Sequence, residues 1–467
     1  MPRGHAGALI RRERAMKLAL KVLVVVLMTL AILVPLAMIR GVVHDRQVYR
    51  AEAVQAIARS EAGAQGIAGP VLVVPWTEIV EVEEKDARGD VVRTVRRDGE
   101  SGEWVFFAQD AAFTARLAPY TRRLGLHEIR MYALTGNLRA RFDVQVPADA
   151  DPALPRRIGQ PWLGYGIADV RGLRAAPRLR LDGSEVALQQ GQGHRGQPGV
   201  HVRLPVPRAG TSLAFDAVLD VELAGAEAFA FAPLATRNHV VVESTWPHPQ
   251  FNGAFLPRER STSASGFRGE WEVSALATNA QAQYRGGQGL SSTDVAAVRD
   301  GGGNGLDVVG ISLVDPVNPY VQADRATKYG VLFVLLTFVG FFMLELVKQL
   351  RIHPIQYGLV GLALSIFFLL LVALSEHIAF GWAYLAASVA CIGLLGFYLA
   401  HVLRSTLRGG GFAAMLALLY AALYGLLVSE DNALVLGAGL LFVILAALMV
   451  ATRRVDWYQL AAPAPKP

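Results

Sequence analysis

The sequence predicts a membrane protein with six transmembrane α-helices and a large, mainly antiparallel, sandwich-like β domain. Apolar residues make up 53% of the 467 residues, more than is usual for a soluble enzyme. They are concentrated in runs near the two ends of the chain, whereas the middle carries charges and glycines throughout. Within that middle, apolar and polar residues alternate over several short stretches, which is the pattern of half-buried strands.

The membrane segments are apolar runs close to the ~20 residues that a spanning helix needs. One run, residues 22–39, follows a basic N-terminal segment, residues 1–21. Five more lie within residues 328–452, at 329–347, 358–374, 378–399, 412–428 and 433–450. The first run could also be a cleaved signal peptide. We favour an uncleaved anchor, because the run exceeds the usual length of about 7–15 residues and Ala37-Met38-Ile39-Arg40 lacks a small-x-small cleavage site.

The charges between the runs predict the orientation of the chain. Cytoplasmic loops of membrane proteins are enriched in Lys and Arg, and here basic and acidic connections alternate. We therefore expect a multi-pass protein of a bacterial inner membrane, with both termini cytoplasmic, a periplasmic domain at residues 40–327 and a cytoplasmic tail at 453–467. The basic connections contain Lys348 and Arg351, Arg404 and Arg408, and Arg453 and Arg454; the acidic ones are Ser375-Glu376-His377 and Ser429-Glu430-Asp431.

The middle of the chain predicts a short helix followed by strands. Residues 45–58 are rich in good helix formers, as expected for a helix that leads out of the membrane. Apolar residues recur at every second position over residues 138–146 and 213–223. An Asp182-Gly183 turn between 178–181 and 186–188 predicts a hairpin. Residues 189–199 and 285–305 lack apolar periodicity and are interpreted as flexible loops.

Charge and cysteine content argue against several classes of function. The formal net charge is +6, but no basic stripe is interleaved with aromatic residues, as binding of single-stranded nucleic acid requires. Cys391 is the only cysteine, so neither an intramolecular disulfide nor a thiolate metal cluster can form. The common metal-binding, phosphate-binding and hydrolase motifs do not occur. We therefore expect no nucleic-acid partner, no cofactor, no metal and no enzymatic activity.

Two polar motifs near the membrane runs are candidate functional sites. In Ser375-Glu376-His377, the side chains could form a nucleophile and base, or a proton or metal site. We favour a hydrogen-bonded turn, because residues one or two apart on a helix face different directions. His353-Pro354 is interpreted as the start of a helix, with a functional imidazole as the alternative. Glu345 is expected to pair with Lys348, three residues later.

The third candidate, in the middle domain, contains Trp246, Pro249 and Phe251. Its aromatic side chains could offer a surface to a glycan or a peptide. We favour the alternative that the prolines fix an extended segment and the aromatic rings fill the core. None of the three motifs supplies a catalytic, cofactor-binding or metal-binding assignment.

A series of motifs follows a characteristic order along the chain. They are Gly69-Pro70 with Val74-Pro75, Asp169-Val170-Arg171-Gly172, Trp246-Pro247-His248-Pro249, Phe255-Leu256-Pro257, Asp315-Pro316-Val317-Asn318-Pro319-Tyr320, Arg351-Ile352-His353-Pro354-Ile355-Gln356-Tyr357-Gly358, Leu374-Ser375-Glu376-His377 and Arg453-Arg454-Val455-Asp456-Trp457-Tyr458. From about residue 40 to residue 458, the chain resembles the CreD family of inner-membrane proteins, also called colicin-tolerance or cell-envelope-integrity proteins. The resemblance implies an envelope protein that is produced, in better-known members, under a two-component sensory system. It implies no catalytic residues.

The leading hypothesis is a non-enzymatic inner-membrane protein that supports cell-envelope integrity and stress or colicin tolerance. Its periplasmic domain would bind or organise an unknown envelope component, and its spans would hold it in the lipid bilayer. The alternative is a transporter or lipid-handling protein that uses the C-terminal bundle; a membrane hydrolase ranks third. A polar cavity in the bundle would favour transport, and a solid apolar interior would count against it. The sequence does not predict the oligomeric state.

Overall fold

A computed structural model describes most of the chain, namely residues 3–85, 91–125, 127–149, 151, 153–193, 196–299, 301–302, 305–314, 319–348, 352–403, 405–429 and 433–453. Side chains are described for these residues except 3–22, 25, 319–320, 344, 346–348, 433–434, 448 and 451–452. The chain divides into two compact units, one of Arg50–Pro316 and one of Met1–Tyr49 with Val317–Pro467. Each unit has its own hydrophobic core.

The membrane unit contains α1 (Arg3–Ser60, of which the last residues belong to the other unit), α4 (Pro319–Lys348), α5 (Pro354–Ser375), α6 (Phe380–Val402), α7 (Thr406–Val428) and α8 (Ala433–Thr452). Among the described residues, five helices are long and apolar enough to cross a membrane: α1, α4, α5, α6 and α7. The sixth predicted span is a helix, α8. Side chains at both of its ends lie outside the described residues, so its described apolar stretch, Val435–Ala447, is shorter than a span. The described part of the chain therefore shows one N-terminal and four C-terminal spans, with helix α8 at the position of the sixth predicted span.

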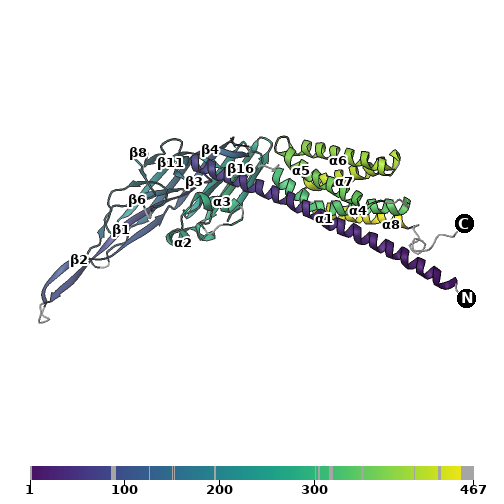
Figure 1. The fold of residues 1–467 in the computed structure, drawn as a ribbon. Coiled ribbons are helices and arrows are strands. Elements are labelled where there is room, and N and C mark those ends of the chain that lie inside the picture. The colour runs from purple at the N-terminus through teal and green to yellow at the C-terminus, as the bar shows by residue number, and fades with distance from the viewer. Residues whose placement is uncertain are drawn as a thin grey trace. The chain divides into compact units, whose positions relative to one another are not determined.

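Helix α1 is continuous, so the predicted anchor at 22–39 and the predicted helix at 45–58 are parts of one element (Figure 1). Its apolar side chains pack into the core of the membrane unit at positions where the other helices carry glycine. A Cβ on Gly361 of α5 would lie 2.5 Å from Ile32, and a Cβ on Gly330 of α4 would lie 3.3 Å from Leu36. The missing side chains let the helices approach closely, which stabilises packing in lipid.

Aromatic rings fill the interior of the bundle. Helix α5 packs on α4 and α6, and α7 packs on α6 and α4, so these four helices surround a common centre. The ring of Tyr420 lies 4.6 Å from that of Phe333 and 4.5 Å from that of Phe367, centre to centre. The hydroxyl of Tyr384 donates a hydrogen bond of 2.7 Å to the backbone oxygen of Tyr420. The Tyr384 hydroxyl thus has a partner inside the protein, as a lipid environment demands.

The other unit consists mainly of strands. They are β1 (Gln65–Lys85), β2 (Val91–Phe107), β3 (Asp110–Leu124), β4 (His127–Gln145), β5 (Arg157–Ile158), β6 (Trp162–Ile167), β7 (Arg178–Leu181), β8 (Ser184–Val186), β9 (Gln189–Gln190), β10 (Gly199–Arg203), β11 (Ser212–Ala226), β12 (Ala228–Ala232), β13 (Arg237–Ser244), β14 (Pro249–Gly253), β15 (Glu259–Ser263), β16 (Gly266–Ser274) and β17 (Val309–Leu313). The short helices are η1 (Val170–Gly172), η2 (Ala275–Ala277), α2 (Ala280–Arg285) and α3 (Ser292–Arg299).

These strands form two sheets with a shared core. One sheet has the order β14-β17-β12-β1-β6-β10-β9, with β2 and β5 also paired to β1; the other has the order β15-β16-β13-β3-β4-β11-β7-β8. Among the described pairs only β1 with β12 and β3 with β13 are parallel. Side chains from both sheets meet in one cluster, where the ring centre of Phe113 lies 5.0 Å from that of Phe231. The prediction of a mainly antiparallel, sandwich-like domain is confirmed.

Strands β1 and β2 continue beyond the other strands as a two-stranded arm (Figure 1). Their pairing extends from Val71 with Phe107 to Lys85 with Val91. Ion pairs cross the arm between Glu81 and Arg96 (3.2 Å) and between Glu84 and Arg93 (2.6 Å). Both arginines are exposed, so these pairs lie in contact with solvent.

The local predictions for this unit have mixed outcomes. The stretches 138–146 and 213–223 lie almost wholly within β4 and β11, and the Asp182-Gly183 hairpin joins β7 to β8. Both turn residues have positive φ, as this tight hairpin turn requires. The prediction of a loop over 189–199 is wrong at its ends, where β9 and β10 pair with each other, and part of this stretch lies outside the described residues.

The prediction of a loop over 285–305 is also wrong, because α3 lies within it. Ser291 and Asp294 form a reciprocal cap at the start of this helix: the backbone N–H of Asp294 donates to Ser291 Oγ (3.2 Å), and that of Ser291 donates to Asp294 Oδ2 (3.0 Å). Such a cap satisfies backbone donors that the first turn leaves free. Val295 buries one side of the helix in the core.

Candidate functional site

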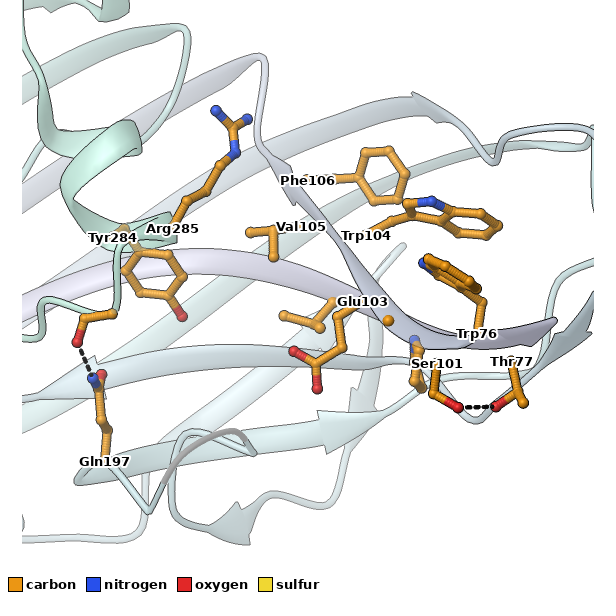
Figure 2. Close-up of a pocket in the computed structure, with 14 residues that line it drawn as sticks. Trp76, Thr77, Ser101, Glu103, Trp104, Val105, Phe106, Gln197, Tyr284 and Arg285 are labelled. Carbon is orange, nitrogen blue, oxygen red and sulfur yellow. Dashed lines mark hydrogen bonds between the residues drawn. The ribbon is translucent and has the colours of Figure 1, made fainter. Parts of the chain in front are cut away.

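A cleft of about 750 Å³ opens beside strands β1 and β2 in the β domain (Figure 2). Side chains alternate across a strand pair, and the pairing places Val73 opposite Val105, Pro75 opposite Glu103, and Thr77 opposite Ser101. These residues share one face of the pair and line the cleft. The hydroxyls of Thr77 and Ser101 lie 3.0 Å apart and form a hydrogen bond. One face of the cleft is therefore apolar at one end and polar at the other.

Helix α2 and the segment before β10 form the opposite wall of the cleft. Tyr284 packs edge-on against Phe107, with ring centres 5.9 Å apart. Its hydroxyl accepts a hydrogen bond of 2.9 Å from Gln192 Nε2. The guanidinium carbon of Arg285 lies 4.9 Å from the ring centre of Phe107, and Arg285 is exposed. Gln197 Nε2 donates to the backbone oxygen of Gly287 (3.4 Å). This wall adds one cation and several hydrogen-bonding groups.

Two tryptophans lie on the other face of the strand pair and also line the cleft. Trp76 and Trp104 stack with ring centres 5.7 Å apart (Figure 2). The guanidinium carbon of Arg156 lies 5.3 Å from the ring of Trp76 and 5.8 Å from that of Trp104. Such a stack of a cation on indoles stabilises the pair in a fixed geometry. The side chains of Trp76, Trp104 and Arg156 therefore pack together where the strand pair leaves the sheet.

The cleft has the chemistry of a binding site. Apolar surface with a few placed polar groups is typical of ligand sites. The hydroxyls of Thr77 and Ser101 bond to each other, and the described residues that line the cleft include no imidazole. Among the described residues, no group of three or more His, Cys, Asp or Glu side chains could hold a metal ion.

The motif Asp169-Val170-Arg171-Gly172 joins the end of α1 to the sheets. The Asp169 carboxylate is buried and accepts from Arg171 Nη2 (2.7 Å), Arg171 Nε (2.9 Å) and the backbone N–H of Gly63 (3.1 Å). Arg171 Nη1 in turn donates to the backbone oxygen of Arg59 in the last turn of α1 (3.0 Å). A Cβ on Gly172 would lie 2.1 Å from Gln65 Nε2, so only glycine fits there.

A second buried carboxylate, Glu227, fixes the same region. It lies between β11 and β12 with a φ of 58°, a strained conformation for a residue with a side chain. Arg50 of α1 donates to it at 2.7 Å, and Arg299 of α3 also pairs with it. Ala53 and Ile57 of α1 pack against Ile129 and Met131 beside this pair.

Comparison with known proteins connects this architecture to a family. The family model described as "Inner membrane protein CreD" matches residues 17–458. The chain belongs to the CreD family. The inner membrane protein CreD of Escherichia coli (strain K12) is 33% identical over 436 residues, which cover 93% of this chain and 92% of that protein. Family membership and the apolar helices make the chain a multi-pass inner-membrane protein.

Two solved structures have a weak likeness to this CreD family member. Yeast LTA4 hydrolase in complex with bestatin has a TM-score of 0.17 and 9% identity, covering 43% of this chain and 28% of that one. Native leukotriene A4 hydrolase from Saccharomyces cerevisiae has a TM-score of 0.19 and 10% identity, covering 49% of this chain and 35% of that one. Scores this low carry no conclusion about fold or activity.

The structure places Ser375 at the end of α5 and Glu376 and His377 in the turn that follows, but gives them separate partners. Ser375 Oγ donates to the backbone oxygen of Val372 (2.8 Å), and the Glu376 carboxylate lies 3.1 Å from Arg46 Nε of α1. The Glu376 side chain is 8% exposed, whereas that of Arg46 is 37% exposed. His377 is exposed. The three side chains do not converge on one point.

His353 and Pro354 begin helix α5. His353 Nδ1 accepts from the backbone N–H of Ile355 (3.3 Å), and the backbone N–H of His353 donates to Gln356 Oε1 (3.1 Å). This reciprocal arrangement is a capping box, with proline in the first turn. Buried Glu345 accepts from the hydroxyl of Tyr357 (2.9 Å); its expected partner Lys348 has a side chain outside the described residues.

Trp246, Pro249 and Phe251 line the border between the two sheets. Trp246 Nε1 donates to the backbone oxygen of Val314 (3.0 Å), and Arg130 lies over its ring at 4.0 Å. Pro249 begins β14. Phe251 packs edge-on against Trp271 at 5.7 Å and also lines a second cleft of about 930 Å³. These contacts leave the aromatic rings mainly engaged in packing.

Asp169→Asn is expected to destabilise the protein by about 2 kcal/mol at neutral pH, the scale of hydrogen bonds to a charged group. Burial acts to raise the pKa of Asp169, but hydrogen bonds from Arg171 and Gly63 outweigh it and hold the pKa below the ordinary value. The carboxylate therefore contributes its full stability above the unfolded pKa and loses it as the pH falls through the lower, folded-state pKa. Urea unfolding followed by tryptophan fluorescence over a pH series measures both effects.

The matched control is Asp143→Asn, at an exposed aspartate of β4. It should leave the free energy of unfolding nearly unchanged. Equal effects of the two substitutions, or an Asp169→Asn variant that loses stability in acid as steeply as the wild type, would contradict the assigned role of Asp169.

Glu376→Gln and Arg46→Gln are each expected to lower the amount of folded protein in the membrane, through a loss of about 1–2 kcal/mol. Because the two side chains pair, the double variant should be no worse than the worse single variant. Membrane abundance and thermal stability in detergent are the measurements. His377→Ala is the control, since this exposed side chain should matter little. If Glu376→Gln kept normal abundance but abolished resistance to envelope stress, Glu376 would have a chemical role instead.

Proposed function

We propose that this protein supports cell-envelope integrity and tolerance of envelope stress or colicins, as a non-enzymatic inner-membrane protein whose β domain binds an envelope component. The observation that carries the proposal is the cleft beside β1 and β2, which combines apolar walls, paired hydroxyls and a cation. Membership of the CreD family supports the envelope setting. The polar groups that line the cleft suit recognition of a ligand better than attack on a bond, because the hydroxyls bond to each other.

The proposal places the β domain in the periplasm and both termini in the cytoplasm. The alternation of basic and acidic connections along the sequence supports this orientation. An alkaline phosphatase reporter inserted at Gly196 and a second one after residue 453 test it, because the reporter folds only in the periplasm. We expect activity from the first and none from the second. The reverse pattern would overturn the orientation.

A transporter or lipid-handling role is the second candidate, and the bundle counts against it. The rings of Phe333, Phe367 and Tyr384 crowd around Tyr420 in the space where a polar path would run. Tyr420 and Phe367 are both buried. A conducting or carrier path needs polar groups or water at this depth.

Blocking the cleft is expected to abolish the protective effect without loss of the protein. Ser101→Trp places a large ring at the exposed, polar end of the cleft. Its matched control is Ser261→Trp, at an exposed serine on β15 of the other sheet. Cells that lack the native copy and carry each variant are scored for survival of colicin and detergent, with membrane abundance measured in parallel. Full protection by Ser101→Trp at normal abundance would overturn the binding role of the cleft.

A further inference from the structure

The residues that line the cleft show that it lies against the edge of β2. Six consecutive residues of this strand, Ser101 to Phe106, line the cavity. Consecutive side chains of a strand point to opposite faces of the sheet. A cavity above one face would contact every second residue only. A cavity that contacts all six reaches residues of both faces of β2 and therefore extends past the side of this strand, besides covering Val73 and Pro75–Thr77 of β1.

That side of β2 carries no other strand in the described part of the domain. Strand β1 pairs with β12 over Gln65–Ala68 and then with β2 from Val71 onward, so β2 takes the place of β12 beside β1. Beyond β12 the sheet continues with β17 and β14, whereas β2 pairs with β1 alone. An edge strand of this kind presents alternate backbone N–H and C=O groups to its surroundings.

The edge strand β15 and the outer part of β2 are protected, but the stretch of β2 at the cleft is not. Proteins protect strand edges with short strands and charged side chains. Strand β15, the edge of the other sheet, is only five residues long and polar throughout. On the arm, β2 carries Arg93, Arg96 and Arg97. From Ser101 to Phe107 the sequence is Ser-Gly-Glu-Trp-Val-Phe-Phe, with a single charge at Glu103.

The walls of the cleft complement an extended chain. Val73 and Val105 offer an apolar site for a side chain on the face of the strand pair, and the exposed guanidinium of Arg285 lies at the opposite wall. Six residues of strand span about 20 Å, so the edge is long enough to pair with a segment of similar length. Arg285 can form a charge-assisted hydrogen bond with a carboxylate.

We propose that the cleft binds an extended peptide segment of another envelope protein, which adds as a strand to the edge of β2. Backbone hydrogen bonds to β2 supply affinity, an apolar side chain packs against Val73 and Val105, and a carboxylate of the peptide pairs with Arg285. Addition of a strand to an open edge is a common mode of peptide recognition. This inference rests on the proposed function, because it names the ligand class of the same cleft.

The test uses the full chain in lipid nanodiscs and a displayed library of short random peptides. Peptides are selected on the wild type and counter-selected on Ser101→Trp. The enriched peptides are synthesised with a single N-methyl group at each backbone position in turn, and their dissociation constants are measured. We expect a weakening of about tenfold at every second residue and little change between them, because only alternate N–H groups of an added strand face β2.

Arg285→Ala provides the second arm of the test. It should weaken peptides that carry a carboxylate several-fold, and should leave their neutral amide versions unchanged. Ser261→Trp should bind all peptides as the wild type does, since β15 belongs to the other sheet.

Three results would overturn the proposal. One is that no peptide is retained by the wild type over Ser101→Trp. Another is that bound peptides show no alternating response to N-methylation. The third is that the chain dimerises through β2 and excludes peptide, which would make a second copy the occupant. In each case, loss of protection by Ser101→Trp in cells would still support the cleft as a binding site. The binding role of the cleft and the addition of a peptide to β2 can therefore be contradicted independently.

Discussion

The carboxylate of Asp169 is the contact on which the organisation of the β domain depends. It accepts from Arg171, which also donates to the last turn of α1, and from the backbone at Gly63, where the chain leaves that helix for β1. Gln65, the first residue of β1, bonds to the backbone of Asp169 and of Ala224. Helix α1, β1, η1 and β11 therefore meet at one buried polar network. Such networks are strong only when every polar group has a hydrogen-bond partner. Residue 172 must be glycine because a Cβ there would displace the Gln65 amide from the network.

Two buried carboxylates, those of Glu227 and Asp169, lie near the end of α1, and each has a positively charged partner. Glu227 would be costly to bury alone, but Arg50 and Arg299 supply two positive partners from different helices. Asp169 has Arg171 in the same way. The pairs of Glu227 connect elements that are distant in sequence, and Arg171 reaches the last turn of α1 through the backbone oxygen of Arg59. Both contacts make the position of the last turns of α1 depend on the folded sheets.

The sequence predicts what depends on local pattern and fails where distant residues decide. Apolar runs identify the spans, because lipid imposes a length on each helix. Alternation locates β4 and β11, and the Asp182-Gly183 pair locates a hairpin, because these signals lie within a few residues. The pattern does not predict helix α3, although Ser291 and Asp294 carry the signal of a capping box; its apolar face is short, and the neighbouring glycines obscure it.

The candidate site could not be predicted from the sequence, for a different reason. Nothing in the sequence around β2 indicates that Arg285 and Tyr284 will lie beside it, since only the tertiary fold brings α2 there. The partner of Glu376 is a similar case: the sequence indicates a structural turn, but Arg46 lies on a helix at the other end of the chain. The family resemblance identifies the Asp169 motif but not its role. The contacts of Arg171 and Gly172 show that the motif joins α1 to the sheets.

The stability of the arm formed by β1 and β2 depends on the salt concentration around the domain. An isolated strand pair is only marginally stable, and the cross-strand pairs of Glu81 with Arg96 and Glu84 with Arg93 are exposed to solvent. Dissolved ions weaken such exposed pairs as the ionic strength rises, whereas the apolar core between the sheets does not depend on them. A rise in salt concentration therefore weakens the ion pairs of the arm, next to the edge of β2 where the cleft begins.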